Sequence, residues 1–188
     1  VIAEGFEAGG HNGREETTTL CLVPAVRKAI DVPLVAAGGI GSGEAIAAAL
    51  MLGADGVQIG SRYVATPESS AHPLFKSKIL DAKEGDTHLA LKGLTPVRLL
   101  DNPFARHVKT AETRGDGLED LRELLGRGRA KKGMFEGDLE EGELEIGQVS
   151  AHLDELKPAG ALTNQLWEEA LQRLETLSQL QVLRRNLS

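Results

Sequence analysis

The stretch that decides the fold is PLVAAGGIGSG, residues 33–43. Its apolar run over Pro33–Ala37 is typical of a parallel strand buried on both faces. Two glycines follow at once, and Ser42 is a suitable N-cap for a helix over Gly43–Leu52. The stretch therefore predicts a buried strand, a tight glycine turn and a helix, in that order.

The same order of elements extends to both sides of this stretch. Strands are predicted over Val1–Glu4 and Gly56–Gly60, and a helix over Thr19–Ile30. Each of the three strands ends at a glycine, as in the βαβ pattern of a parallel sheet, where ligands bind at the carboxyl ends of the strands. We predict an α/β unit over residues 1–66 and a helical and loop extension over residues 67–188 that packs on it.

The extension has a different character from the first unit. Its predicted elements are a helix over Ser69–Ala82, extended segments over Thr87–Leu91 and Val97–Leu100, and an amphipathic helix over Pro158–Leu177. Residues 110–147 are charged and glycine-rich, with the basic cluster Arg127–Lys132 beside the acidic segment Glu136–Glu145. Opposite charges this close in sequence predict a folded loop in which they neutralise each other. Three single residues receive structural roles: Cys21 in the core, Trp167 docking the last helix, and Arg98 paired with a carboxylate.

Composition narrows the possible functions. The 188 residues carry a formal net charge of −7, which argues against a nucleic-acid groove, and no apolar run approaches the roughly 20 residues of a membrane span. One cysteine cannot close an internal disulfide, so a cytoplasmic location is expected. The spacing of the His, Cys, Asp and Glu residues fits no metal-binding motif, so no metal site is predicted. Because the sequence opens inside a predicted strand, we expect a missing N-terminal half, or a second copy in a homo-oligomer, to complete the fold.

Two features at the strand ends indicate a catalytic residue and a ligand-binding site. The segment EGFEAGGHNG, residues 4–13, surrounds His11 with four glycines, and an imidazole is suited to proton transfer at neutral pH. The structural alternative is a surface loop in which His11 only caps neighbouring side chains. The glycine loops at residues 38–43 and 60–61 expose backbone N–H groups, and the helix after Gly41 adds its positive end. Together these loops predict a phosphate cradle that needs no lysine.

Three motifs resemble one known family. EGFEAGGH at residues 4–11, AAGGI at 36–40 and GADGVQIGSR at 53–62 are similar to the FMN-dependent nitronate monooxygenases, also called 2-nitropropane dioxygenases. The resemblance implies a TIM (β/α)₈ barrel of the FMN-binding type, with the three predicted strands as its strands six to eight. It implies His11 as the catalytic base. It also implies FMN contacts at nine positions, namely Glu4, Ala8, Gly9, Gly38, Gly39, Gln58, Ile59, Gly60 and Ser61.

Two positions depart from the family pattern. Glu4 stands where Gln or Asp is usual, and Ser61 stands where Thr is usual. The change to serine keeps a hydroxyl, whereas a glutamate beside the flavin would alter its surroundings. The first departure therefore bears on the substrate class more than on flavin binding.

The resemblance implies oxidative denitrification of a nitronate or nitroalkane, with dioxygen as the second substrate. Two alternatives stay open. One is an FMN-dependent enoyl-ACP reductase that uses NAD(P)H, has a similar histidine loop, and would meet its acidic carrier at the basic cluster Arg127–Lys132. The other is a non-catalytic flavin-binding half-barrel that assembles with a separate N-terminal chain, for which a missing His11 would be the discriminating feature.

Overall fold

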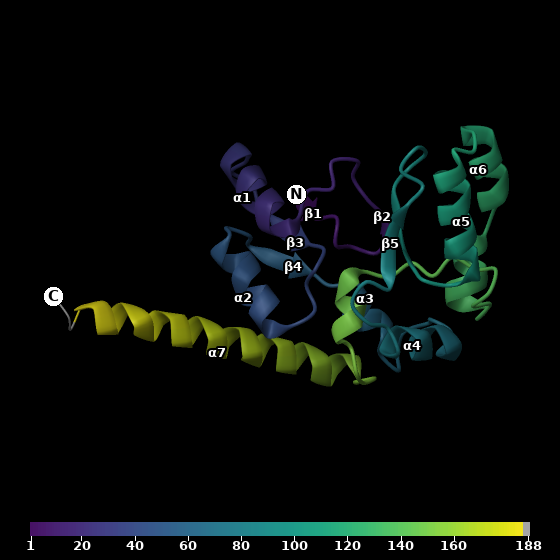
Figure 1. Ribbon diagram of the computed structural model, residues 1–188. Helices are drawn as coiled ribbons and strands as arrows, with labels where there is room; N and C mark the ends of the chain where they lie inside the picture. The colour runs from purple at the N-terminus through teal and green to yellow at the C-terminus, as the bar shows by residue number, and fades with distance from the viewer. Residues whose placement is uncertain (186–188) are drawn as a thin grey trace.

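The computed structural model describes the backbone of residues 1–185 and the side chains of residues 1–179. Three short strands, β1 (Ile2–Glu4), β3 (Val35–Ala37) and β4 (Gly56–Gln58), form a parallel sheet in the order β1-β3-β4. Helix α1 (Thr19–Ala29) connects the first pair and α2 (Gly43–Met51) the second (Figure 1). The predicted βαβ order of the first unit is confirmed, and the protein is a mixed α/β structure.

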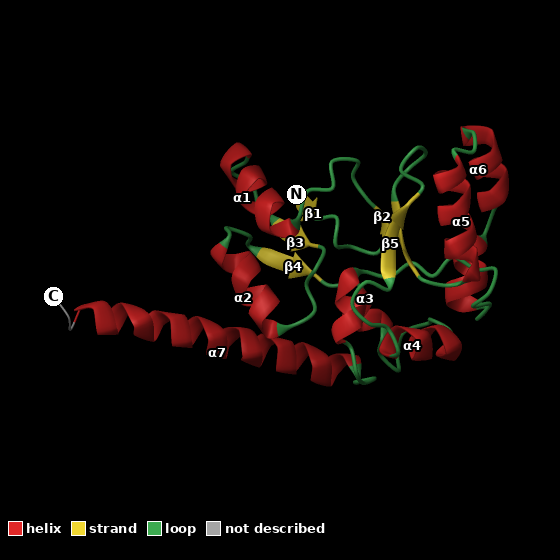
Figure 2. Ribbon diagram, in the orientation of Figure 1, coloured by secondary structure: helices red, strands yellow, loops and turns green. Residues whose placement is uncertain are grey.

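The register of this sheet brings the strand ends together. Glu4 pairs with Ala37, and Ala37 pairs with Gln58, so the last residues of the three strands lie side by side. Ser42 caps α2, as predicted, because its hydroxyl accepts the backbone N–H of Ala45 at 3.3 Å. The loops that follow the strands therefore meet at one edge of the sheet (Figure 2).

A second sheet is antiparallel. It contains β2 (Gly10–His11), β6 (Val97–Leu100) and β5 (Thr87–Ala90), in the order β2-β6-β5. The two extended segments predicted in the extension are confirmed as its longer strands. The histidine loop joins the two sheets, since it leaves the parallel sheet after β1 and enters the antiparallel sheet at β2.

Five further helices and two short helical turns complete the described part of the chain. They are α3 (Ser61–Val64), α4 (Pro73–Leu80), α5 (Pro103–Arg114), α6 (Leu118–Leu125) and α7 (Ala159–Arg185), with a π-helical turn at Lys131–Phe135 and a 3₁₀ turn at Gln148–His152. Helix α4 begins four residues later than predicted, because His72 caps it and Pro73 occupies its first turn.

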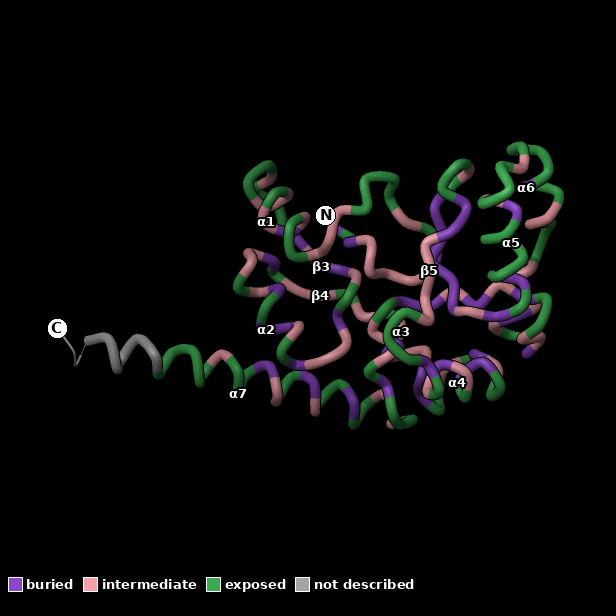
Figure 3. The backbone as a smooth tube through the Cα atoms, viewed as in Figure 1, coloured by how far each residue is buried: buried purple, intermediate pink, exposed green. Residues whose placement is uncertain are grey.

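Helix α7 shows how the extension packs on the first unit. Leu162, Leu166 and Ala170 are buried in a core that includes Leu34 of the parallel sheet and Ile46 of α2. Beyond Ala170 the described side chains are mostly exposed, and the helix runs past the rest of the chain (Figure 3). The predicted amphipathic helix is confirmed, and only its first half provides the docking face.

Four sequence predictions outside the site need correction. Cys21 is exposed, because it lies on the solvent side of α1, and Trp167 is 51% exposed, because Leu162 and Leu166 dock α7 instead. Arg98 is buried but donates to the carbonyl of Phe6 and the hydroxyl of Thr87, so its partners are not carboxylates.

The segment 110–147 is also more ordered than a charged loop. It contains the C-terminal part of α5 and all of α6, because Asn102 caps α5 and Leu121 buries one face of α6. The predicted neutralisation of its charges is confirmed by three ion pairs: Arg129–Glu141 at 3.2 Å, Lys131–Glu136 at 3.0 Å and Lys132–Asp138 at 2.9 Å.

Candidate functional site

A cavity of about 230 Å³ lies at the carboxyl ends of the three parallel strands. The last residue of each strand contributes to its wall, and so do the glycine loops that follow. Eight of the nine predicted cofactor-binding residues line it: Glu4, Ala8, Gly9, Gly38, Gly39, Gln58, Gly60 and Ser61. The position of the cavity follows from the parallel register, which brings three distant loops to one point.

The backbone of the glycine loops is free to bind a ligand. Within the described residues, no hydrogen bond uses the backbone N–H of Gly39, Gly60 or Ser61. Gly39 has a φ of +68°, a conformation that favours glycine, and a Cβ added to Gly60 would meet no atom within 4 Å. Unpaired amides around open space are the donors that a phosphate group needs.

The amino end of α2 is less available than the sequence indicated. Ser42 accepts the N–H of Ala45, and the N–H of Gly43 donates to the carboxylate of Glu169 on α7 at 3.3 Å. A carboxylate already interacts with the positive end of this helix. An anion in the cavity would therefore meet mainly the amides of Gly39, Gly60 and Ser61.

A segment from the extension closes one side of the cavity. The backbone N–H of Gly147 donates to Ser61 Oγ at 2.9 Å, and the N–H of Gln148 donates to the carbonyl of Glu7 at 2.9 Å. A Cβ at Gly147 would lie 3.0 Å from that carbonyl, so the close approach requires glycine. The hydroxyl of Ser61 keeps its own proton for a ligand.

Glu7 lines the cavity without being a free base. Both of its carboxylate oxygens accept the backbone N–H of Thr19 at 3.1 Å, at the first turn of α1. The hydroxyl of Thr19 lies 2.8 Å from the carbonyl of Gly38 and donates to it. Glu7 thus ties the histidine loop to α1 and to the loop after β3.

Two predicted site residues lie outside the cavity wall. Ile59 packs against the core beneath the parallel sheet. His11 is exposed in β2, two residues beyond Gly9, and its backbone pairs with Val97. Within the described residues the imidazole of His11 makes no hydrogen bond, so its nitrogens are free.

Sequence reasoning missed the contribution of the extension to the cavity. Met134, Glu145, Ile146, Gly147 and Val149 all line it. These residues lie in segments without a short motif, so no sequence signal pointed to them.

Two carboxyl groups near the cavity are perturbed. Burial raises the pKa of Glu4. Burial also raises the pKa of Glu143, and the charge of Glu145 adds to that shift, whereas the positive charge of His11 lowers it.

Neither a metal-ligating cluster nor a membrane-spanning helix occurs in the described part of the chain. No three His, Cys, Asp or Glu residues there converge on a possible metal position. None of its helices combines the length and the apolar character needed to cross a bilayer.

One family model and several known proteins are similar to this chain. The family model for nitronate monooxygenase matches residues 1–169. A probable nitronate monooxygenase of Bacillus subtilis is 45% identical over 96 residues, which cover 47% of this chain and 28% of that protein. These matches confirm the family expected from the three motifs.

Solved structures agree with the sequence matches. The structure of FabK from Thermotoga maritima is 40% identical with a TM-score of 0.89, and covers 96% of this chain. A nitroalkane oxidase from Streptomyces ansochromogenes is 36% identical with a TM-score of 0.74, and covers 94% of this chain. The chain spans 57% and 53% of these two proteins, about half the length of each. The chain belongs to the nitronate monooxygenase family.

Proposed function

We propose that the complete protein is an FMN-dependent oxidoreductase that acts on nitronates or nitroalkanes. The observation that carries the proposal is the cavity at the parallel strand ends, with three unused backbone amides around open space. Family membership and the similarity to a nitroalkane oxidase support an oxidoreductase of this substrate class.

The donor set fits the phosphate of FMN. The amides of Gly39 and Gly60, with the amide and hydroxyl of Ser61, would hold that group without a cationic side chain. The bound cofactor would supply an electron-accepting ring. Glu4 and Gln58, which end β1 and β4, offer polar groups to the part of the cofactor beyond the phosphate.

A barrel is the architecture in which this site would be complete. Within the described residues, β1 and β4 each have one unpaired edge, and Ile2 is 58% exposed. An apolar hollow beside β4 is lined by Val57, Tyr63 and Trp167, among others. Five further strands, from an N-terminal half of the protein, would pair with both edges and close a (β/α)₈ barrel. A homo-oligomer is the other way to cover these surfaces.

His11 is the proposed base. Its exposed imidazole has no partner among the described residues, and Gly9 links it to the cavity wall. A neutral imidazole there would take the acidic proton from the carbon next to a nitro group. A preformed nitronate has already lost that proton, so His11 would only orient it. Oxidation would then break the C–N bond, release nitrite and leave a carbonyl group on carbon, with dioxygen as the oxidant and the source of the carbonyl oxygen.

One argument for the enoyl-ACP reductase alternative, the basic cluster Arg127–Lys132, is weakened by the structure. The basic cluster that was to meet an acidic carrier is largely neutralised by Glu136, Asp138 and Glu141. A non-catalytic half-barrel is disfavoured because His11 is present and free. A cytoplasmic location stays a prediction.

Spectroscopy and turnover of the full-length protein test the proposal. Purified protein should show flavin absorption and release nitrite from a nitronate only when oxygen is present. If NADPH bleaches the flavin without oxygen and nitronates give no nitrite, the reductase alternative is correct. If no flavin is bound after reconstitution with FMN, the half-barrel and both enzyme assignments fail together.

A further inference from the structure

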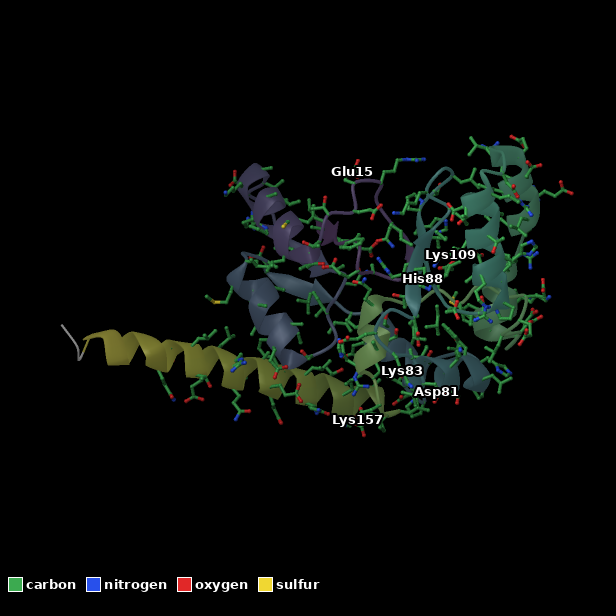
Figure 4. The ribbon with its side chains drawn as sticks, viewed as in Figure 1. Glu15, Asp81, Lys83, His88, Lys109 and Lys157 are labelled. Carbon is green, nitrogen blue, oxygen red and sulfur yellow. The ribbon has the colours of Figure 1, made fainter. Side chains whose placement is uncertain are left out.

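A second cavity, of about 300 Å³, lies between the antiparallel sheet and α5. It shares no lining residue with the cavity at the parallel strand ends. Its lining contains four basic side chains, His88, Lys92, Arg98 and Lys109, against the single carboxylate of Glu112. Figure 4 shows His88 of β5 and Lys109 of α5 at neighbouring positions on the two facing walls. In a chain with a net charge of −7, this local excess of positive charge is unusual.

Arg98 is the buried member of this cluster. Its Nε and Nη2 donate to the carbonyl of Phe6 at 3.1 and 2.8 Å, and Nη1 donates to the hydroxyl of Thr87 at 3.3 Å. A guanidinium has five N–H bonds, so two of them remain unused. The residue is 2% exposed and makes no ion pair with any side chain of residues 1–179. Burial lowers the pKa of Arg98, and the negative charges of Glu7 and Glu16 partly offset that shift.

The other cations are also available. Among the described residues, the side chains of His88 and Lys109 make no hydrogen bond or ion pair. Lys92 pairs with Glu16 at 2.6 Å, on the exposed side of the cavity. The carboxylate of Glu112 accepts the backbone N–H of Lys92 at 3.2 Å and forms no ion pair with the cationic side chains of this cavity. An anion that enters would therefore find donors on both walls.

Apart from Thr87 and Gln148, the rest of the lining is apolar. Ala90, Leu99 and Ala105 are buried, and the Phe6 ring lies 5.2 Å from the guanidinium carbon of Arg98. Such a surface suits a hydrocarbon or aromatic group, whereas the two free Arg N–H groups, an ammonium and an imidazole suit a dianion with several oxygens.

We propose that this cavity binds a phosphate monoester that carries a small apolar or aromatic group. The phosphate would lie among Arg98, His88 and Lys109, and the organic group would lie against Leu99 and Phe6. The site is separate from the phosphate cradle of the first cavity and does not depend on the reaction proposed there.

Phenyl phosphate is the probe that tests the site. The protein is full-length and saturated with FMN, so that the first phosphate site is filled, and binding is measured by calorimetric titration. Lys109→Gln and His88→Gln should each weaken binding by about 10-fold, because each removes a charge-assisted hydrogen bond. Neither side chain has a described partner, so both variants should keep the wild-type Tm. Lys83→Gln, at an exposed lysine outside the cavity, is the matched control and should bind like the wild type.

Two comparisons would overturn the proposal. Equal affinity in Lys109→Gln, His88→Gln and Lys83→Gln would mean that phenyl phosphate does not bind in this cavity. Inorganic phosphate that binds as tightly as phenyl phosphate would show that the apolar wall takes no part. Absence of binding to the wild type would overturn the proposal directly.

Discussion

The hydroxyl of Ser61 accepts the backbone N–H of Gly147 at 2.9 Å, which joins the end of the parallel sheet to a segment 86 residues away. This contact places Gly147 and its neighbours over the cavity, where sequence reasoning placed only loops of the first unit. This hydroxyl holds the closing segment, and its own proton stays available for the phosphate of the proposed cofactor.

Removal of that hydroxyl tests both functions. Ser61→Ala should weaken FMN binding by about 10-fold, because the phosphate loses a donor and Gly147 loses its acceptor. Ser61→Thr keeps the hydroxyl and should bind FMN like the wild type. Flavin fluorescence during titration of the apoprotein measures both affinities. Equal affinities for the alanine and threonine variants would contradict a role for the hydroxyl.

Gly60 of the proposed phosphate cradle has a matched control in Gly56, which lies outside the cavity. A Cβ at either Gly60 or Gly56 would meet no atom within 4 Å, so both positions have room for a Cβ. Only Gly60 lines the cavity. Gly60→Val should lower FMN affinity about 10- to 100-fold by blocking the phosphate from the backbone amides. Gly56→Val should leave it unchanged. If Gly60→Val binds FMN as tightly as the wild type, the phosphate does not bind at this loop.

Glu143 gives a prediction about pH and stability. Its raised pKa means that the folded state favours the neutral carboxyl, so its contribution to stability is present at low pH and is lost as the pH rises through the folded pKa. Glu143→Gln stays neutral at every pH. Its Tm should exceed that of the wild type at about pH 8, and the difference should disappear near pH 4. A constant Tm difference across this range would show that Glu143 has an ordinary pKa.

The docking of α7 depends on its buried face, which Leu162 tests and the exposed Leu171 controls. Leu162 is fully buried against the core of the first unit, whereas Leu171 on the same helix is 47% exposed. Leu162→Ala should lower the free energy of unfolding by about 2–5 kcal/mol. Leu171→Ala should change it by less than about 0.5 kcal/mol. Urea unfolding of the two variants makes the comparison, and equal losses would mean that α7 does not dock through this face.

The strands of the first unit were predictable because each has a short apolar run that ends in glycine. The parallel register then fixed the site, since Glu4, Ala37 and Gln58 must lie side by side. The closing segment around Gly147 was not predictable, because its position depends on hydrogen bonds to Ser61 and Glu7 that leave no periodic pattern. The predicted burial of Cys21 was wrong for a similar reason, since which face of α1 is buried depends on packing around Val23.

The position of His11 was predictable as a loop residue at a strand end but not as part of β2. Two residues that pair with β6 are too few to show a strand pattern. Arg98 was expected to pair with a carboxylate, and its actual partner, the carbonyl of Phe6, is a backbone group that no sequence pattern identifies.

The central claim is that His11 is the base that deprotonates the substrate. The most direct measurement is turnover of His11→Ala in the full-length, FMN-loaded protein, with a neutral nitroalkane and with its preformed nitronate. Turnover of the nitroalkane should fall by roughly 10²–10⁴-fold while that of the nitronate falls much less and FMN stays bound. Equal losses on both substrates, or no loss on either, would contradict the assignment of His11 as the base.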